Sequence, residues 1–282
     1  MITVFAHDVM TAPVFIVSPN DTIAYVRNLM VSHRISRVLV MEEGKLTGIL
    51  TKKDIAYRLR QPGAAWRHRS PDRIPVSGLA TGDPVVVAPD TGLGAVARIF
   101  VARNISCVPV MENGTVAGIV TKSDLMRSSL VASLVGMARD MMEDVATVNR
   151  NHSIAHVITV MSGRNDKVVV MNNDGTIAGI ITETNLAFYD DEKKIAGTLE
   201  KDVRIRRREK ADGTSGMSSL IVAAVTAEDV MTSPVVTVIP GCPLADAVVL
   251  MGRQHINSLV VVENGTPVGI VKRDDIIKEV AK

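Results

Sequence analysis

The stretch GILTKKDI at residues 48–55 recurs three more times along the chain, with small changes. The copies read GIVTKSDL at 118–125, GIITETNL at 179–186 and GIVKRDDI at 269–276. A second stretch precedes each copy; it reads DVMTAPV from Asp8 and DVMTSPV from Asp229, with weaker forms from Leu79 and Asp140. Pro13 to Asp54 spans 41 positions, and Pro234 to Asp275 also spans 41. Two landmarks at a fixed spacing indicate four tandem copies of one unit.

The first copy shows the pattern that the others follow. An extended segment, Val14–Val17, leads to a polar cap at Asn20 or Asp21. Apolar residues at three- and four-residue steps then predict a helix, with Ile23, Val26, Leu29 and Met30 on one face. Apolar runs at 38–41 and 46–50 flank a Glu-Gly turn and predict a hairpin, after which a helix begins at about Lys53. The unit is β-α-β-β-α and cannot bury both faces of its sheet alone, so we expect units to pair.

The repeat fixes the expected fold class and domain organisation. We predict an α/β (α+β) fold with units at residues 1–60, 78–130, 138–190 and 226–282. Residues 61–77 carry Gln-Pro-Gly and Ser-Pro sequences, which are typical of a linker. Residues 193–225 form a longer insertion, in which the alternation at 203–206 predicts an edge strand or hairpin turning at Asp212-Gly213.

Composition narrows both the class of protein and the cellular compartment that we expect for it. The chain has 282 residues, which is too long for one typical domain, and 46% of them are hydrophobic. A net charge of +2 gives no bulk attraction to nucleic acid or membrane, and 3% aromatic residues provide few stacking platforms for bases. The two cysteines, Cys107 and Cys242, have no metal-binding spacing. Apolar stretches such as Leu220–Val225 are far shorter than the ~20 residues of a membrane span, and no signal peptide is evident. We expect a reduced, cytoplasmic setting and no membrane partner.

The unit, its DVMT-x-P opening and its G-h-h-T-x-x-D ending (h, apolar) together resemble CBS domains, across all four copies. A chain of four such domains is similar to the gamma subunit of AMP-activated protein kinase and to the archaeal relatives of that subunit. The resemblance implies two Bateman modules of paired units, forming a flat disc-like assembly with two clefts per module. In the family these clefts most often hold adenosine-containing ligands. The implied activity is therefore regulatory signal transduction, such as energy sensing.

The T-x-x-D ending contains the candidate ribose-binding residues. A carboxylate at a helix start can accept hydrogen bonds from both hydroxyls of a ribose, and the free N–H groups there favour an anion. Alternatively, Thr51 is simply the N-cap and Asp54 the acid of a capping box, and the two roles can coexist. The third unit has Asn185 instead of Asp, and the fourth has Lys272 instead of Thr. We rank adenosine binding as Asp54 and Asp124 first, then Asp275, then Asn185. The ribose candidates are Thr51, Asp54, Thr121, Asp124, Thr182 and Asp275.

Basic residues before the middle strand are the candidate phosphate ligands. HRISRVLV, which begins at His33-Arg34, resembles the His-Arg pair that contacts nucleotide phosphate in the kinase gamma subunit. The two-fold pairing of the family implies that Arg103 serves the Asp54 site and His33-Arg34 the Asp124 site. In the same way, His255 would serve the Asn185 site and Arg164 the Asp275 site. The alternative is a solvated helix end, where the helix dipole favours cations anyway. The candidates are His33, Arg34, Arg103, Arg164, His255 and Lys272.

The opening segments are expected to line the adenine, because backbone groups there can read the purine edge and apolar side chains can sandwich the ring. Alternatively each is a strand start with Pro at its edge. The residues concerned are Met10, Thr11, Pro13, Val14, Pro84, Val85, Met231 and Pro234.

Metal and catalytic chemistry find little support in the sequence. His152 and His156 are four residues apart, but no third ligand is evident, so we expect no metal site. No nucleophile elbow, P-loop, dinucleotide fingerprint or Cys–His motif occurs, so we predict no catalytic residues, no cofactor and no enzyme activity.

The leading hypothesis is a regulatory protein that senses AMP, ADP or ATP, with a homodimeric assembly and a protein target that the sequence does not name. A second hypothesis is a sensor of S-adenosylmethionine or methylthioadenosine, which share the adenosine. A third is a nucleic-acid-binding regulator that uses KDVRIRRREK, residues 201–210, with a net charge of +4. That stretch is alternatively a solvated edge strand protected by its charges. A fourth is a structural scaffold with vestigial clefts.

Overall fold

The computed structural model describes residues 3–55, 70–161, 165–186 and 225–282. It divides into two compact bodies, a larger one of Met1–Val145 with Val235–Lys282 and a smaller one of Ala146–Pro234. The basic stretch 201–210, the predicted hairpin around Asp212-Gly213 and linker residues 61–69 lie outside the described residues. Each body is described below by itself, and the disc-like assembly of modules stays a prediction.

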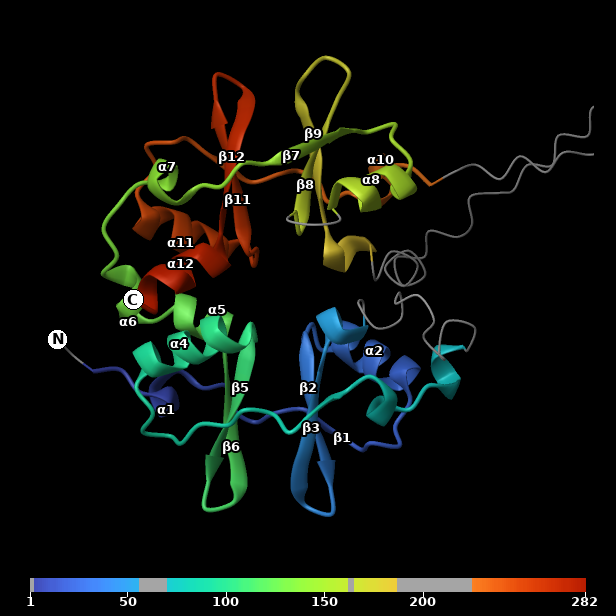
Figure 1. Cartoon of the computed structure of the whole chain (residues 1–282), viewed down its shortest axis with the longest axis vertical. Helices are drawn as coiled ribbons and strands as arrows, with labels where there is room; N and C mark the ends of the chain where they lie inside the picture. The colour runs from blue at the N-terminus through green and yellow to red at the C-terminus, as the bar shows by residue number, and fades with distance from the viewer. Residues whose placement is uncertain (1–2, 56–69, 162–164, 187–224) are drawn as a thin grey trace, which may run out of the picture. The chain divides into compact units, whose positions relative to one another are not determined.

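Each repeat contains a helix and a hairpin, as predicted, and a short strand precedes the helix in the first, third and fourth repeats (Figure 1). The first has α1 (Ala6–Val9), β1 (Ile16–Val17), α2 (Ile23–Ser32), β2 (Arg37–Glu42) and β3 (Lys45–Thr51). The linker contains η1 (Pro71–Arg73), and η2 (Val76–Gly78) leads into the second repeat, which has β4 (Thr81–Gly82), α4 (Leu93–Arg103), β5 (Cys107–Glu112), β6 (Thr115–Thr121), α5 (Lys122–Met126) and α6 (Ser129–Ala132). The third has α7 (Ala138–Met141), β7 (Ala146–Asn149), α8 (Ile154–Met161), β8 (Lys167–Met171) and β9 (Ile177–Thr182). The fourth has α10 (Ala227–Val230), β10 (Thr237–Val238), α11 (Leu244–Arg253), β11 (Ser258–Glu263), β12 (Thr266–Lys272) and α12 (Arg273–Val280).

The hairpin turns follow from residues that tolerate a left-handed backbone. Asn113 and Gly114 have φ of 49° and 79°, and Asn264 and Gly265 have 50° and 83°. Positive φ at both positions is the geometry that the right-handed twist of two flanking strands favours. Glu43 adopts the same conformation, with φ of 49°, although glutamate seldom does so.

The second repeat departs from the predicted strand pattern. In the first repeat the N–H of Leu39 donates to the carbonyl of Phe15 at 2.9 Å, which starts the parallel pairing of β1 with β2. The equivalent of Leu39 in the second repeat is Pro109, which has no N–H to donate. The first strand of that repeat is therefore reduced to one parallel bridge between Val87 and Val110.

The aspartate of the DVMT opening caps a short helical turn. Asp8 Oδ2 accepts the backbone N–H of Phe5 at 2.8 Å, and Asp229 Oδ2 accepts that of Thr226 at 3.0 Å. An acid in the first turn that reaches back to the N-cap stabilises a helix start. Met10 is the C-cap of α1, and the segment that follows it leads into β1 at Ile16.

The first two repeats complete each other's sheets. Strand β3 pairs with β4 of the second repeat, where Ile49 lies opposite Thr81. In return, Thr11 of the first repeat exchanges two backbone hydrogen bonds with Ile119 of β6, at 2.9 and 3.1 Å. Between the two hairpins, which lie side by side in Figure 1, a small core contains Leu39, Ile49, Cys107 and Ile119. The expected pairing of units is thus confirmed for the first two repeats.

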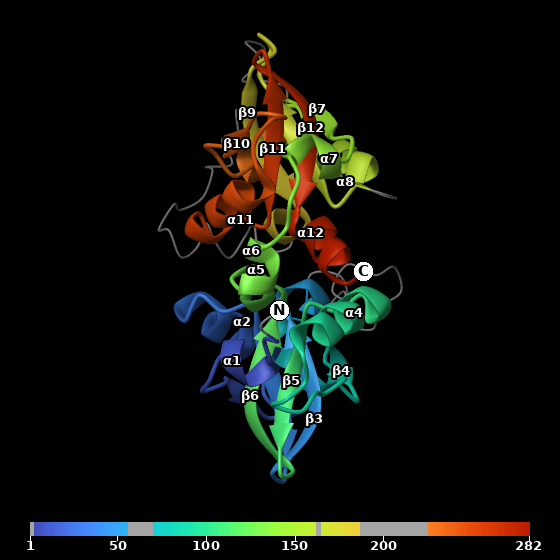
Figure 2. The same ribbon diagram turned by 90° about the vertical axis from the view of Figure 1, so that its left-hand side faces the viewer.

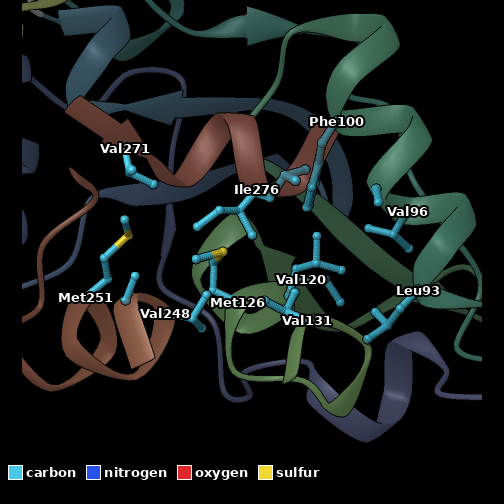
Figure 3. Close-up of a cluster of buried hydrophobic side chains, with 14 of the residues drawn as sticks. Leu93, Val96, Phe100, Val120, Met126, Val131, Val248, Met251, Val271 and Ile276 are labelled. Atoms are coloured by element: carbon cyan, nitrogen blue, oxygen red, sulfur yellow. The ribbon is translucent and has the colours of Figure 1, made fainter. Parts of the chain in front are cut away.

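The main core of the larger body joins the second and fourth repeats. Figure 2 shows α5 and α6 next to α11 and α12, and Figure 3 shows the side chains between them. Phe100 is fully buried, and Val131 and Ile276 are as well. Burying a large aliphatic or aromatic side chain contributes about 1.5–3 kcal/mol. The labelled cluster comprises Leu93, Val96, Phe100, Val120, Met126, Val131, Val248, Met251, Val271 and Ile276.

The smaller body contains the sheet β7-β8-β9, against which α8 and α10 pack. Val157 of α8 and Val168 of β8 are fully buried, and Val230 of α10 joins them in one cluster. Thr232 exchanges two backbone hydrogen bonds with Ile180 of β9, so the last strand of the third repeat is bordered by the segment that leads into the fourth.

Candidate functional site

The T-x-x-D ending of the first repeat forms a capping box with an acceptor left over. Asp54 Oδ2 accepts the N–H and the hydroxyl of Thr51 at 2.8 and 2.7 Å, and Thr51 Oγ1 accepts the N–H of Asp54 at 3.2 Å. All of these bonds to the carboxylate use Oδ2. Among the described residues, no hydrogen bond reaches Oδ1 of Asp54, which is partly exposed. Capping therefore leaves one carboxylate oxygen for a ligand hydroxyl.

The second repeat forms the same box and adds an ion pair. The N–H of Thr121 donates to Asp124 Oδ2 at 2.9 Å, and Thr121 Oγ1 accepts from the N–H groups of Ser123 and Asp124. Arg127 donates to Oδ1 of Asp124 at 2.5 Å. The Arg127 side chain is 63% exposed, whereas that of Asp124 is 3% exposed. Arg127 was not among the residues predicted from the sequence. A ligand hydroxyl would have to displace its guanidinium from Asp124 Oδ1 or share that oxygen with it.

The third repeat keeps the box with an amide. Asn185 Oδ1 accepts the N–H and the hydroxyl of Thr182 at 3.0 and 2.7 Å. The amide nitrogen of Asn185 donates to Thr232 Oγ1 at 2.8 Å. The Asn side chain has its single oxygen and one N–H engaged inside the protein, and it has no charge with which to hold a diol.

The fourth repeat has replaced the box by a network of charged groups. Lys272 Nζ lies 2.8 Å from Glu143 Oε2, and Lys278 Nζ lies 2.8 Å from Asp275 Oδ1. Lys278 also lies 3.9 Å from Glu143 Oε1, so the four groups form one chain of alternating charge. The hydrogen bond with Lys272 lowers the pKa of Glu143, and burial raises the pKa of Asp275. Glu143 was not singled out from the sequence, because its contact with Lys272 joins distant segments.

The segments that lead into each repeat cross the last strand of another repeat at a glycine. A Cβ on Gly118 would lie 2.8 Å from Met10 Sδ, and one on Gly179 would lie 2.5 Å from Met231 Sδ. The methionines thus lie on the strand backbone, which only glycine permits. At Gly48 the neighbouring side chain is the smaller Ala80.

The remaining adenine candidates lie along these segments. Val14 packs against the small core between the first two hairpins. Pro84 lines a pocket with Lys45, Asp83 and Met111. Thr11, Pro13 and Pro234 are exposed, and Val85 is partly buried.

The basic candidates lie at helix ends. His33 is the C-cap of α2 and its ring packs 4.7 Å from that of Phe15. Arg34 and His255 follow α2 and α11 in the left-handed conformation, with φ of 53° and 54°. Arg103 is the last residue of α4, and all four side chains are exposed. Arg164 lies outside the described residues.

A cluster of charges at the starts of α5 and α12 was not predicted. Lys122 Nζ is 2.9 Å from Asp274 Oδ2, and Arg273 Nη1 donates to Ser123 Oγ at 3.3 Å. Burial lowers the pKa of both Lys122 and Arg273. These residues occupy the variable positions of the T-x-x-D endings, so their charge was visible in the sequence but their meeting was not.

Two further features concern cysteine and histidine. Cys107 is buried, which raises its thiol pKa, while the nearby Arg37 opposes that shift; Arg37 also donates to the carbonyl of Ser106 at 3.1 Å. The rings of His152 and His156 meet edge to face at 4.3 Å. The described residues contain no cluster of three or more metal-ligating side chains, and none of their helices is long and apolar enough to cross a membrane.

Comparison with known families adds to this geometry. The model of the CBS domain matches residues 6–61, 76–130, 135–192 and 227–282. The chain belongs to the CBS domain family. CBS domain-containing protein YhcV of Bacillus subtilis is 30% identical over 131 residues, which cover 46% of this chain and 89% of that protein. A CBS-domain chain of this kind has a regulatory, ligand-binding role.

Two further matches are an enzyme and a protein of known crystal structure. Inosine-5'-monophosphate dehydrogenase of Korarchaeum cryptofilum is 30% identical over 121 residues, which cover 43% of this chain but 23% of that enzyme. CBS domains therefore also occur as parts of enzymes. The crystal structure of MJ1225 from Methanocaldococcus jannaschii, described as a proposed archaeal homologue of gamma-AMPK, matches with a TM-score of 0.74 at 18% identity. The match covers 98% of this chain and 99% of that one, and it shows a shared fold.

Proposed function

We propose that this chain is a regulatory protein that binds adenine nucleotides in the clefts between its first two CBS repeats. The observation that carries the proposal is the Thr51–Asp54 box, in which one carboxylate oxygen closes the helix cap and the other accepts no hydrogen bond from the part of the chain that the structure describes. A ribose diol can donate to such an oxygen, and the bond is charge-assisted. Asp124 would serve a second ribose after Arg127 shifts or shares its oxygen.

The charges around these boxes favour a phosphorylated ligand over an uncharged one. Lys52 and Lys53 lie between Thr51 and Asp54, and Lys122 lies beside Thr121. The exposed His33, Arg34 and Arg103 offer further cations at helix ends. Ammonium and guanidinium groups form charge-assisted hydrogen bonds with phosphate oxygens.

The regulatory mechanism would be a difference in affinity between two arrangements of the paired repeats. A ligand shifts such an equilibrium only by as much as it prefers one arrangement. Because each of the first two repeats borders the other's last strand, a ligand that contacts a T-x-x-D box and a leading segment touches both repeats at once. A protein target that recognises one arrangement would then respond to occupancy.

Titration calorimetry with AMP, ADP and ATP, and separately with S-adenosylmethionine and methylthioadenosine, tests the proposal. We expect micromolar binding of at least one nucleotide, a higher melting temperature on saturation, and weaker binding of the two sulfur-containing ligands. Binding of those two alone would replace the nucleotide by another adenosine ligand. No binding of any of the five below millimolar concentration, with an unchanged melting temperature, would refute the proposal.

The variant Asp54→Asn separates ligand binding from capping. Asn185 shows that an amide can accept both Thr hydrogen bonds of the box, so the variant keeps its helix start. A hydrogen bond to a charged group contributes about 1.5–3 kcal/mol, so affinity at that site should fall by about 10- to 150-fold. Asp21→Asn is the control, because its carboxylate accepts one backbone N–H, that of Ser18 at 2.7 Å, outside the box. Equal effects of the two variants would contradict the ribose role of Asp54.

The assembly completes the proposal. We expect a homodimer, and a separate protein target rather than a nucleic acid. Light scattering of the purified chain, with and without ligand, measures the oligomeric state. Nucleic-acid binding with a steep salt dependence, lost when the arginines of 201–210 are replaced, would instead support the third hypothesis.

A further inference from the structure

The ribose position of the fourth repeat differs from the other three at two places that meet in space. The leading residue that bridges the last strand is a threonine in three cases and Glu143 in the fourth. The first residue of the T-x-x-D ending is likewise a threonine in three cases and Lys272 in the fourth. The threonines at the leading position are Thr11, Thr81 and Thr232, and those at the motif position are Thr51, Thr121 and Thr182.

Glu143 and Lys272 have opposite charges, and their side chains are long enough to meet. Glu143 is tied to β12 by two backbone hydrogen bonds with Ile270, at 3.0 and 2.9 Å, which places its side chain beside the end of that strand. Its Oε2 lies 2.8 Å from Lys272 Nζ, and the Lys272 side chain is only 15% exposed. The other three repeats have short hydroxyl side chains at both positions. In the fourth repeat the longer glutamate and lysine side chains occupy them and meet.

The carboxylate that would hold the diol is also engaged. Asp275 Oδ1 accepts from Lys278 at 2.8 Å, and its Oδ2 is buried and has no hydrogen-bond partner among the described residues. Burial raises the pKa of Asp275, and the negative charge of Glu143 raises it further. The charges of the fourth site cancel, with three cations and three carboxylates, whereas the first box has two lysines and one aspartate; the six groups are Lys272, Arg273, Lys278, Glu143, Asp274 and Asp275. The fourth site therefore offers neither an accessible acceptor nor an excess of positive charge.

We propose that the Glu143–Lys272 ion pair closes the ribose position of the fourth repeat and so excludes adenosine ligands from that site. The inference rests on the proposed function, because it concerns which of the boxes accept the same ligand. Residues Glu143 and Lys272 are thus specificity-determining. The ranking of adenosine binding predicted from the sequence, with Asp275 above Asn185, therefore changes. Asp275 has the required carboxylate, but a ligand cannot reach it.

The double variant Glu143→Thr/Lys272→Thr tests this by gain of a site. It recreates the residues of the second repeat, Thr11 and Thr121, around Asp275. Equilibrium dialysis with radiolabelled AMP is expected to give one more site per chain than the wild type. Glu279→Thr/Lys282→Thr, which removes an exposed pair with a 2.5 Å separation on the same helix and at the chain end, is the matched control and should leave the stoichiometry unchanged.

A charge-swapped variant, Glu143→Lys/Lys272→Glu, restores the pair in reverse and should keep the wild-type stoichiometry. If the double threonine variant fails to fold by circular dichroism, Glu143→Gln replaces it, since the amide keeps the length but loses the ion pair; a weak extra site is then expected. An unchanged stoichiometry in a folded threonine or glutamine variant would overturn the inference. So would a loss of bound AMP on removal of Glu143, because the residue would then be a ligand.

The two proposals fail in different ways. A wild type that binds AMP while the threonine variant gains nothing leaves the proposed function intact and removes the closure. A wild type and a variant that both bind no adenosine ligand remove both. A wild type without binding and a variant with one site would support the closure and contradict the proposed sites at Asp54 and Asp124.

Discussion

Replacing Gly118 by alanine should strain the crossing between the first two repeats. An ideal Cβ at this position lies 2.8 Å from Met10 Sδ, 3.0 Å from Met10 Cγ and 3.0 Å from the carbonyl oxygen of Thr11. Carbon atoms in contact are normally about 3.5–4.0 Å apart. The methionine can rotate away. The Thr11 carbonyl is backbone, and it accepts the N–H of Ile119 at 3.1 Å, so moving it stretches the bond that joins the repeats.

The size of the destabilisation depends on which neighbouring atoms must move to make room for the Cβ. Overpacking a filled position costs about 1–3 kcal/mol. Losing both hydrogen bonds between Thr11 and Ile119 would cost about 2 kcal/mol, because each contributes about 1 kcal/mol net. We therefore expect Gly118→Ala to lower the free energy of unfolding by about 1–3 kcal/mol.

Urea unfolding monitored by circular dichroism measures this change. Gly252→Ala is the control, since a Cβ there meets nothing within 4 Å and alanine is the better helix former by up to about 1 kcal/mol. A second variant, Met10→Ala combined with Gly118→Ala, should recover only the part due to the side chain. If Gly118→Ala is as stable as the wild type, the close approach of the leading segment is not what requires glycine at this position.

Three further outcomes follow from the described contacts. Phe100→Ala should destabilise the larger body by about 3–5 kcal/mol in urea unfolding, because a fully buried ring is removed from its core; a cost below 1 kcal/mol would contradict the packing. Asp274→Ala should lower the free energy of unfolding by about 1–3 kcal/mol, because it leaves the buried Lys122 ammonium without its nearest anion. Lys122→Met should change it by less than about 1 kcal/mol, since the Asp274 side chain is 49% exposed and stays hydrated. For Glu143 the folded pKa is lowered, so its contribution is present above the ordinary glutamate pKa of about 4.3 and is lost as the pH falls through the folded value. Glu143→Gln should therefore lower the melting temperature at pH 7, with a difference from wild type that narrows as the pH falls below about 4.3; a constant difference would exclude titration of this carboxyl as the cause.

Local chemistry explains why much of the fold could be predicted from the sequence. The Asn-Gly turns at 113–114 and 264–265 allow positive φ at both positions, and the apolar spacing through Ile23, Val26 and Met30 marks the buried face of a helix. The loss of the first strand in the second repeat was also readable, because Pro109 in the middle of a strand cannot donate a hydrogen bond. These signals act within one repeat, so no long-range information is needed.

The capping boxes of the candidate site could be predicted from the sequence, whereas the long-range contacts of their carboxylates could not. The Thr-x-x-Asp boxes are local and appear as expected, but the state of each carboxylate depends on partners elsewhere. Arg127 is near in sequence and could have been found by its spacing from Asp124. Glu143 reaches Lys272 only because their strands pair, and no pattern of spacing within a repeat reports that contact. The same holds for Lys122 and Asp274.

The reciprocal crossing of the first two repeats has a consequence for how such a sequence can be inherited. Residues near the start of the chain, around Thr11, border the hairpin that ends at Thr121, while the segment at Thr81 borders the hairpin that ends at Thr51. A gene fragment that encodes one repeat would produce a hairpin with an uncovered edge, and its leading segment would have no strand to join. Duplication and loss should therefore favour pairs of repeats over single ones, since the pair is the smallest piece whose edges are closed.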